Sequence, residues 1–291
     1  MVRVVRGVVY QYGFRLLLGE VPRLVYGNDA GFWENYSARR ELRRLRRAQA
    51  PSVAPDDRAE FLSSEGYLPL GKPFDPELVR RIADRFRALI GDPEASQPVG
   101  PRIRDAARAL ARPLDSIPEI RELLTDDLGR VLNAYYGSAF TVKHVRAWRN
   151  MPVPEAFEKQ DVYSNLWHND HDPVTLLRLF VYLTDGVTRH TGATHFHSIP
   201  MTRRIMRKGY LRRRAILPAA RRVLEDPQRI RYFEGDVGSA CLLNPQLCLH
   251  RAGVPAPGSY RDIVQFTIAP SDRPLAADWA DRLPPDPGAL A

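Results

Sequence analysis

The stretch NLWHNDHDPVTLLRLFVYL, residues 165–183, joins a polar cluster to an apolar run. Two histidines and two aspartates lie within five residues, and a β-branched and aromatic segment follows them. Residues two apart on a β-strand point to the same face, whereas neighbours point to opposite faces. His168 and Asp170 can therefore reach one metal ion together, but His171 and Asp172 cannot do so without a β-bulge. The stretch predicts a strand that carries part of a metal site.

A third ligand has to come from another part of the chain. In LLNPQLCLHRAG, residues 242–253, His250 ends an apolar run beside a glycine- and proline-rich turn. Two imidazoles and one carboxylate form the facial triad of non-haem Fe(II) oxygenases, which leaves positions free for a cosubstrate and O₂. A rival set stays open, because His195 and His197 are also two apart and could join His250 in a cupin-type site that needs no 2-oxoglutarate. The glutamate that usually follows such a pair is absent.

The order of the expected elements indicates the fold class. FDPELVRRIADRFRALIGD, residues 74–92, predicts a helix with Asp75 as N-cap, Pro76 in the first turn and Gly91 as its end, and a second helix is expected around residues 120–135. From Phe140 onward the chain changes to short apolar runs separated by turns, which predict strands. Helices followed by strands favour an α+β protein with an antiparallel sandwich or barrel as its core.

We divide the chain into two parts. Residues 1–58 are a basic N-terminal extension that ends in a proline-containing linker. Residues 59–291 are one domain, with a helical part at 59–139, a strand-rich core at 140–270 and a basic, helical insertion at 201–231.

The amino-acid composition indicates which partners and which cellular location to expect. The net charge of +9 over 291 residues comes almost entirely from arginine, and a basic balance favours anionic partners. We find no apolar run long enough to span a membrane and no secretory leader, and we expect the two cysteines to be reduced core residues, which indicates a cytoplasmic protein. Residues 1–25 mix arginine with apolar residues, so peripheral contact with an anionic membrane surface remains open.

Several separate stretches resemble the phytanoyl-CoA dioxygenase family of Fe(II)/2-oxoglutarate-dependent oxygenases. WHND, residues 167–170, resembles the family's Trp-His-Gln-Asp motif, and EGDVGSACLLNPQLCLHRAG, residues 234–253, resembles the strand that leads to the distal histidine. Arg261 stands eleven places after His250, where the family keeps an arginine that binds 2-oxoglutarate. The likeness covers about residues 61–270 and leaves residues 1–58 outside.

The resemblance implies a double-stranded β-helix, or jelly roll, with flanking N-terminal helices. It also implies Fe(II), 2-oxoglutarate and O₂, with the metal held by the three residues His168, Asp170 and His250. Arg261 would bind the far carboxylate of 2-oxoglutarate in a two-bond fork, and Asn169, in the place of the family's glutamine, would hydrogen-bond the cosubstrate. Family halogenases lack the aspartate, so hydroxylation of a C–H bond is expected. The sequence departs from the family at Ala252, where a hydroxyl residue is usual.

The substrate is predicted from charge alone. Arg203, Arg204 and Arg207 of the basic insertion are expected to flank the mouth of the active site and to bind an anionic small molecule. A second class of function stays open, namely a basic protein that binds nucleic acid or a membrane surface without chemistry. No nucleic-acid-binding motif is visible, so we expect no nucleic-acid partner.

Overall fold

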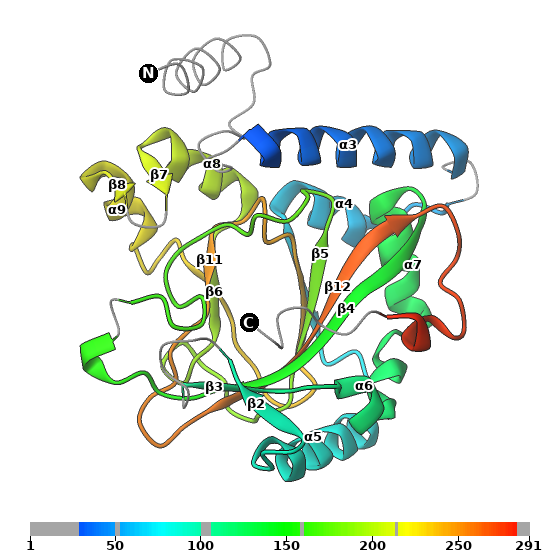
Figure 1. Cartoon of the computed structure of the whole chain (residues 1–291). Coiled ribbons are helices and arrows are strands. Elements are labelled where there is room, and N and C mark those ends of the chain that lie inside the picture. Colours follow the sequence, from blue (N-terminus) through cyan, green and yellow to red (C-terminus); the bar gives the residue numbers. More distant parts are fainter. Residues whose placement is uncertain (1–28, 50–52, 100–105, 158–159, 213–214, 284–291) are drawn as a thin grey trace.

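The computed structural model describes residues 29–49, 53–99, 106–157, 160–212 and 215–283. In this part of the chain, helices surround a core of antiparallel strands (Figure 1), which confirms the predicted α+β class. No helix among these residues has the length and apolar character needed to cross a membrane.

Two antiparallel sheets form the β-core. The large sheet has the order β1-β10-β5-β12-β4-β3-β2, and the small sheet has the order β11-β6-β9. The strands of the large sheet are β1 (Tyr67–Gly71), β2 (Ser96–Pro98), β3 (Ala107–Leu110), β4 (Ala139–Asn150), β5 (Leu177–Tyr182), β10 (Ala240–Leu243) and β12 (Arg261–Ser271). Those of the small sheet are β6 (Thr194–Phe196), β9 (Arg231–Phe233) and β11 (His250–Arg251).

The helices lie around the two sheets, α3 to α7 near the large sheet and α8 and α9 on the side of the small sheet (Figure 1). They are α3 (Asp29–Gln49), α4 (Asp57–Glu65), α5 (Pro76–Ile90), α6 (Pro113–Ser116), α7 (Asp126–Tyr136), α8 (Ile199–Arg207) and α9 (Pro218–Leu224), with 3₁₀ turns η2 (Pro118–Leu123), η3 (Glu155–Phe157) and η4 (Trp279–Arg282). Helix α5 confirms the predicted boundaries, because the Asp75 side chain accepts a hydrogen bond from the Glu77 amide and Gly91 follows the last turn.

Alternation along the central strands separates a core face from a pocket face. On β12, Val264, Phe266 and Ile268 pack with α5 and α7 in the main core cluster, while the residues between them point to the other side. There a second cluster joins the two sheets. Tyr182 of β5 stacks on Phe233 of β9 and donates a hydrogen bond to the Phe233 carbonyl at 2.6 Å. The stacked rings of Tyr182 and Phe233 therefore connect the large sheet to the small sheet.

The N-terminal boundaries differ from the prediction. Strands β1 to β3 lie within the expected helical part, because short strands at the sheet edge carry too few residues for a clear alternation. Helix α3 packs on the domain, since Leu45 is buried and Arg46 donates to the carbonyls of Tyr135 and Tyr136 at 2.9 and 2.8 Å. Residues 29–49 are thus part of the domain body. The membrane contact predicted for residues 1–25 lies outside the described residues.

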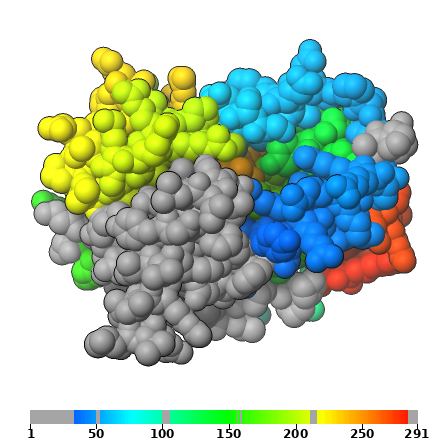
Figure 2. Space-filling view, turned by 90° about the horizontal axis from the view of Figure 1, so that it is seen from above, coloured from blue at the N-terminus to red at the C-terminus, as the bar shows by residue number. Residues whose placement is uncertain are grey.

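The basic insertion forms α8, the hairpin of β7 (Tyr210–Arg212) and β8 (Ala215–Ile216), and α9. Figure 2 shows the insertion and α3 on the same face of the molecule. Its apolar residues, among them Ile205, Met206 and Leu224, pack around Trp167, and Tyr210 donates a hydrogen bond to the Trp167 carbonyl at 2.8 Å. The insertion therefore packs against Trp167, the residue that precedes His168 in the chain.

Candidate metal centre

Two histidines from distant parts of the chain meet in a backbone bridge. The amide of His168 donates to the carbonyl of His250 at 2.9 Å, and the reverse bond has the same length. Each imidazole is also oriented by its own segment: Nδ1 of His168 lies 2.8 Å from the Leu166 carbonyl oxygen, and Nδ1 of His250 lies 3.1 Å from that of Cys248. Because a carbonyl oxygen only accepts, Nδ1 donates to it in the neutral ring, and Nε2 of each ring is then the atom that can bind a metal.

Asp170 completes the group. Its Oδ1 lies 3.3 Å from Nε2 of His168 and 3.6 Å from Nε2 of His250, and one ligand atom of each residue lies within 4.8 Å of the others. Within the described part of the chain, no other cluster of three histidine, cysteine or acidic side chains meets this criterion. The structure therefore brings together the three predicted residues, but His168 and Asp170 do not lie on the predicted strand: His168 forms an isolated bridge with His250, and β5 begins only at Leu177.

The charge state of this group suits a cation. Burial would raise the pKa of Asp170, but the hydrogen bond with His168 and the charges of His250 and Arg178 outweigh it, so the pKa is lowered. Burial and the neighbouring His168 lower the pKa of His250 to about 4. At neutral pH the site thus presents a carboxylate and a neutral His250 imidazole, which are the forms that coordinate a metal.

Arg261 lies in the same pocket and is 2% exposed. It donates to the Gly192 carbonyl at 2.6 Å, to Thr194 Oγ1 at 3.1 Å and to Asn150 Oδ1 at 2.6 Å, all neutral acceptors. Its Nε has no partner, and no carboxylate among the described residues lies within ion-pair distance of it. A buried cation without a counter-charge is costly, so this guanidinium is suited to binding a carboxylate ligand.

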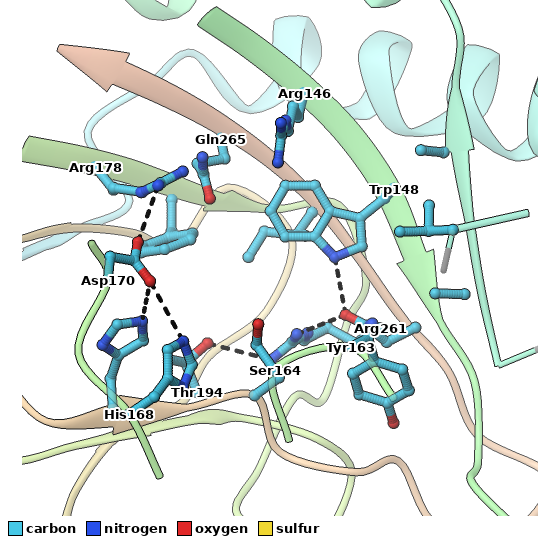
Figure 3. Close-up of a pocket in the computed structure, with 18 of the residues that line it drawn as sticks. Arg146, Trp148, Tyr163, Ser164, His168, Asp170, Arg178, Thr194, Arg261 and Gln265 are labelled. Atoms are coloured by element: carbon cyan, nitrogen blue, oxygen red, sulfur yellow. Dashed lines mark hydrogen bonds and ion pairs between the residues drawn. The ribbon is translucent and has the colours of Figure 1, made fainter. Parts of the chain in front are cut away.

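The pocket has a volume of about 490 Å³ and lies between the two sheets (Figure 3). Strands β4, β5 and β12 supply its floor, through alternate residues that face away from the main core. The floor and walls include Arg146, Trp148, Asn150, Arg178, Phe180, Ile263 and Gln265, and small residues of β3 open one side. Trp148, Phe180 and Ile263 give this otherwise polar lining an apolar part.

Ala252 also lines this pocket, which leaves open the source of the hydroxyl that the resemblance led us to expect. Three hydroxyl residues line the pocket: Thr194, bonded to Arg261, Ser164, and Tyr163, whose hydroxyl donates to the Met151 carbonyl. Ser164 has φ 66° and is the only described residue other than glycine with a positive φ. Such conformations concentrate at functional sites because surrounding structure has to enforce them.

Two groups of predicted site residues lie elsewhere. Asn169 does not line the pocket, unlike His168 and Asp170, and its amide donates to the Gln246 carbonyl at 2.8 Å. Position therefore argues against a role in binding 2-oxoglutarate. The substrate residues Arg203, Arg204 and Arg207 are exposed on α8 and outside the pocket, because the apolar face of this helix points to the protein.

The rival histidines do not reach the metal ligands. His197 is fully buried, stacks on Trp167 with centroids 4.8 Å apart and has Nε2 3.0 Å from the Leu224 carbonyl oxygen. His195 accepts a hydrogen bond from Arg251 at 2.9 Å. Thr194 faces the pocket, so the histidines that follow it at one and three places face the other side. The cupin-type set of His195, His197 and His250 is wrong for this structure.

Arg178 is the site residue that the sequence analysis missed. It is the second residue of β5 and lies 2.9 Å from Asp170 Oδ2 and 2.5 Å from Asp172 Oδ2. A charged residue within the apolar run LLRLFVY was the available signal, because arginine is rarely buried without a partner.

No family model matches the chain, and neither does any curated protein. Among solved structures the chain is similar to the non-heme alpha ketoglutarate dependent carbocyclase SnoK from nogalamycin biosynthesis, with a TM-score of 0.53 and 16% identity over 81% of this chain and 93% of that one. The epimerase SnoN, in complex with Fe3+, alpha ketoglutarate and nogalamycin RO, gives 0.52 and 16% over 78% and 89%. EctD from S. alaskensis gives 0.52 and 14% over 75% and 78%.

At these identities the likeness shows the fold. The chain has the jelly roll with flanking helices found in non-heme 2-oxoglutarate-dependent enzymes, which confirms the predicted fold. The narrower resemblance to the phytanoyl-CoA dioxygenase family stays a prediction.

Proposed function

We propose that the protein is an Fe(II)/2-oxoglutarate-dependent dioxygenase that hydroxylates a C–H bond of a small molecule. One observation carries the proposal: a two-histidine, one-carboxylate group and a buried arginine without a counter-charge share a single pocket. The first suits ferrous iron, and the second suits the far carboxylate of a keto-diacid. The structural neighbours SnoK and SnoN, whose names state dependence on alpha ketoglutarate, support this assignment.

Each residue has a defined task in this reaction. Nε2 of His168, Nε2 of His250 and Oδ1 of Asp170 would hold the iron, and Arg261, set by Asn150 and Thr194, would orient 2-oxoglutarate. When bound, iron and 2-oxoglutarate supply with O₂ the oxidising power for the hydroxylation, and succinate and CO₂ are released. Trp148, Phe180 and Ile263 would contact the apolar part of a substrate in this pocket.

We keep the proposal of an anionic substrate, now supported by Arg146, which lines the pocket, whereas the arginines of α8 do not. Arg178 also lines the pocket, but Asp170 and Asp172 offset its charge. The two neighbours are named as a carbocyclase and an epimerase, so product analysis has to identify the outcome of the oxidation here. We also propose a cytoplasmic location, because the buried thiols of Cys241 and Cys248 are free.

Anaerobic spectroscopy tests the proposal. Fe(II) and 2-oxoglutarate added together should produce a weak visible charge-transfer band that saturates at one 2-oxoglutarate per chain, and His250→Ala should abolish it. Admission of O₂ in the presence of a metabolite pool should then release succinate. A protein that gives no band at saturating Fe(II) and 2-oxoglutarate is not an enzyme of this class. DNA or anionic vesicles retained by such a protein would favour the basic binding protein instead.

A further inference from the structure

The two oxygens of Asp170 have different partners (Figure 3). Oδ1 faces the imidazoles, at 3.3 Å from Nε2 of His168 and 3.6 Å from Nε2 of His250. Oδ2 points the other way and lies 2.9 Å from an Nη atom of Arg178. One oxygen is thus directed at the metal position, and the other is held by a cation.

Arg178 is itself fixed. Its backbone lies in the large sheet, where it is paired with Leu243 of β10 on one side and Thr267 of β12 on the other. The same Nη atom that contacts Asp170 lies 2.5 Å from Oδ2 of Asp172, and the second Nη atom lies 3.4 Å from Thr267 Oγ1. Its side chain is only 15% exposed. The guanidinium is therefore held by Asp172 and Thr267 independently of Asp170.

The number of oxygens that Asp170 offers decides how many positions remain on a six-coordinate ion. A carboxylate can bind a metal through one oxygen or through both. Two histidines and one oxygen leave three positions, which is the open face of this ligand set. Two histidines and both oxygens leave two, and a chelating 2-oxo acid fills them completely.

We infer that Arg178, backed by Asp172, is a positioning residue that keeps Asp170 a one-oxygen ligand and so preserves the third open position. The inference rests on the proposed function and adds a control element to it. Without Arg178, Oδ2 is released and can turn toward the metal, so 2-oxoglutarate still binds but leaves no vacant position.

Nitric oxide tests this directly, because it binds ferrous iron at a free position and gives a quantifiable half-integer-spin EPR signal. The protein is loaded anaerobically with Fe(II) and 2-oxoglutarate, the charge-transfer band is recorded, and nitric oxide is then added. Arg178→Gln should keep the band but lower the EPR signal per iron to about one third or less, because the open face is lost. Arg178→Lys, which restores one donor to Oδ2, should recover most of the signal. Arg80→Gln, at an exposed position on α5, is the matched control and should match the unsubstituted protein.

The outcomes separate the inference from the proposed function. An unchanged nitric oxide signal in Arg178→Gln would overturn the inference and leave the function intact. Loss of the charge-transfer band together with the signal would show that Arg178 maintains the whole ligand set, and would also overturn it. Absence of the band in the unsubstituted protein would instead refute the proposed function.

Discussion

Replacement of Arg261 by methionine should uncouple 2-oxoglutarate binding from metal binding. The guanidinium is buried, makes three hydrogen bonds to neutral acceptors and retains an Nε donor without a partner. Two charge-assisted hydrogen bonds to a carboxylate contribute at least about 3 kcal/mol together. That energy corresponds to a Kd for 2-oxoglutarate about 150-fold higher in the variant.

The assay is an anaerobic titration of the Fe(II)-loaded protein with 2-oxoglutarate, followed through the charge-transfer band. A 2-oxo acid without the distal carboxylate, 2-oxobutanoate, is the control ligand, and both proteins should bind it equally weakly. Thermal unfolding gives an independent readout. At 100 times its Kd, 2-oxoglutarate stabilises the unsubstituted protein by about 2.7 kcal/mol, and the same concentration should leave the Tm of Arg261→Met almost unchanged. A variant that binds 2-oxoglutarate nearly as tightly as the unsubstituted protein would refute the role of Arg261.

Three further predictions concern the frame around the site. Burial, and then Arg251, lower the pKa of His195 to about 3. The metal-free protein should therefore lose unfolding free energy as the pH falls below 6.5, and His195 should account for about 1.4 kcal/mol of this loss per pH unit. Denaturant titrations of His195→Gln should show a shallower pH dependence than those of the unsubstituted protein, and an equal dependence would contradict the assignment. Arg149→Met leaves the fully buried Asp262 without its bidentate partner and should cost about 3–5 kcal/mol by urea unfolding; a loss below about 1 kcal/mol would show that the pair is not needed. Gly253→Ala places a methyl group 2.2 Å from the backbone carbonyl oxygen of Ala193 and should lower both the Tm and Fe(II) binding. Gly91→Ala is the control, because its methyl group meets open space, and it should change neither. Equal Tm values for the two variants would contradict the close approach of Gly253 to Ala193.

Rules that use only neighbouring residues, such as side-chain alternation and helix capping, predicted part of the structure. The alternation expected of a strand selected His168 and Asp170, although neither lies on a strand here, and the capping pattern of Asp75 and Pro76 gave the start of α5. Asn169, which the resemblance suggested, lies outside the pocket.

The remaining features depend on which distant segments become neighbours. Nothing within residues 177–182 shows that Arg178 faces Asp170, because the segment between them folds back before β5 begins. The charge of Arg203 and its neighbours predicted an anion site, but charge density does not reveal which face of a helix points to the pocket. Strands β1 to β3 are short, and their place in the sheet depends on distant partners: β1 pairs with β10 and β3 with β4, while β2 adds to β3 at the edge.

Anomalous diffraction at the iron edge, from crystals grown anaerobically with Fe(II) and 2-oxoglutarate, tests the central claim most directly. We expect one iron peak within about 2.0–2.2 Å of Nε2 of His168, Nε2 of His250 and Oδ1 of Asp170, with the far carboxylate of 2-oxoglutarate on Arg261. An iron peak away from these three atoms, or a 2-oxoglutarate molecule that does not touch Arg261, would contradict the account.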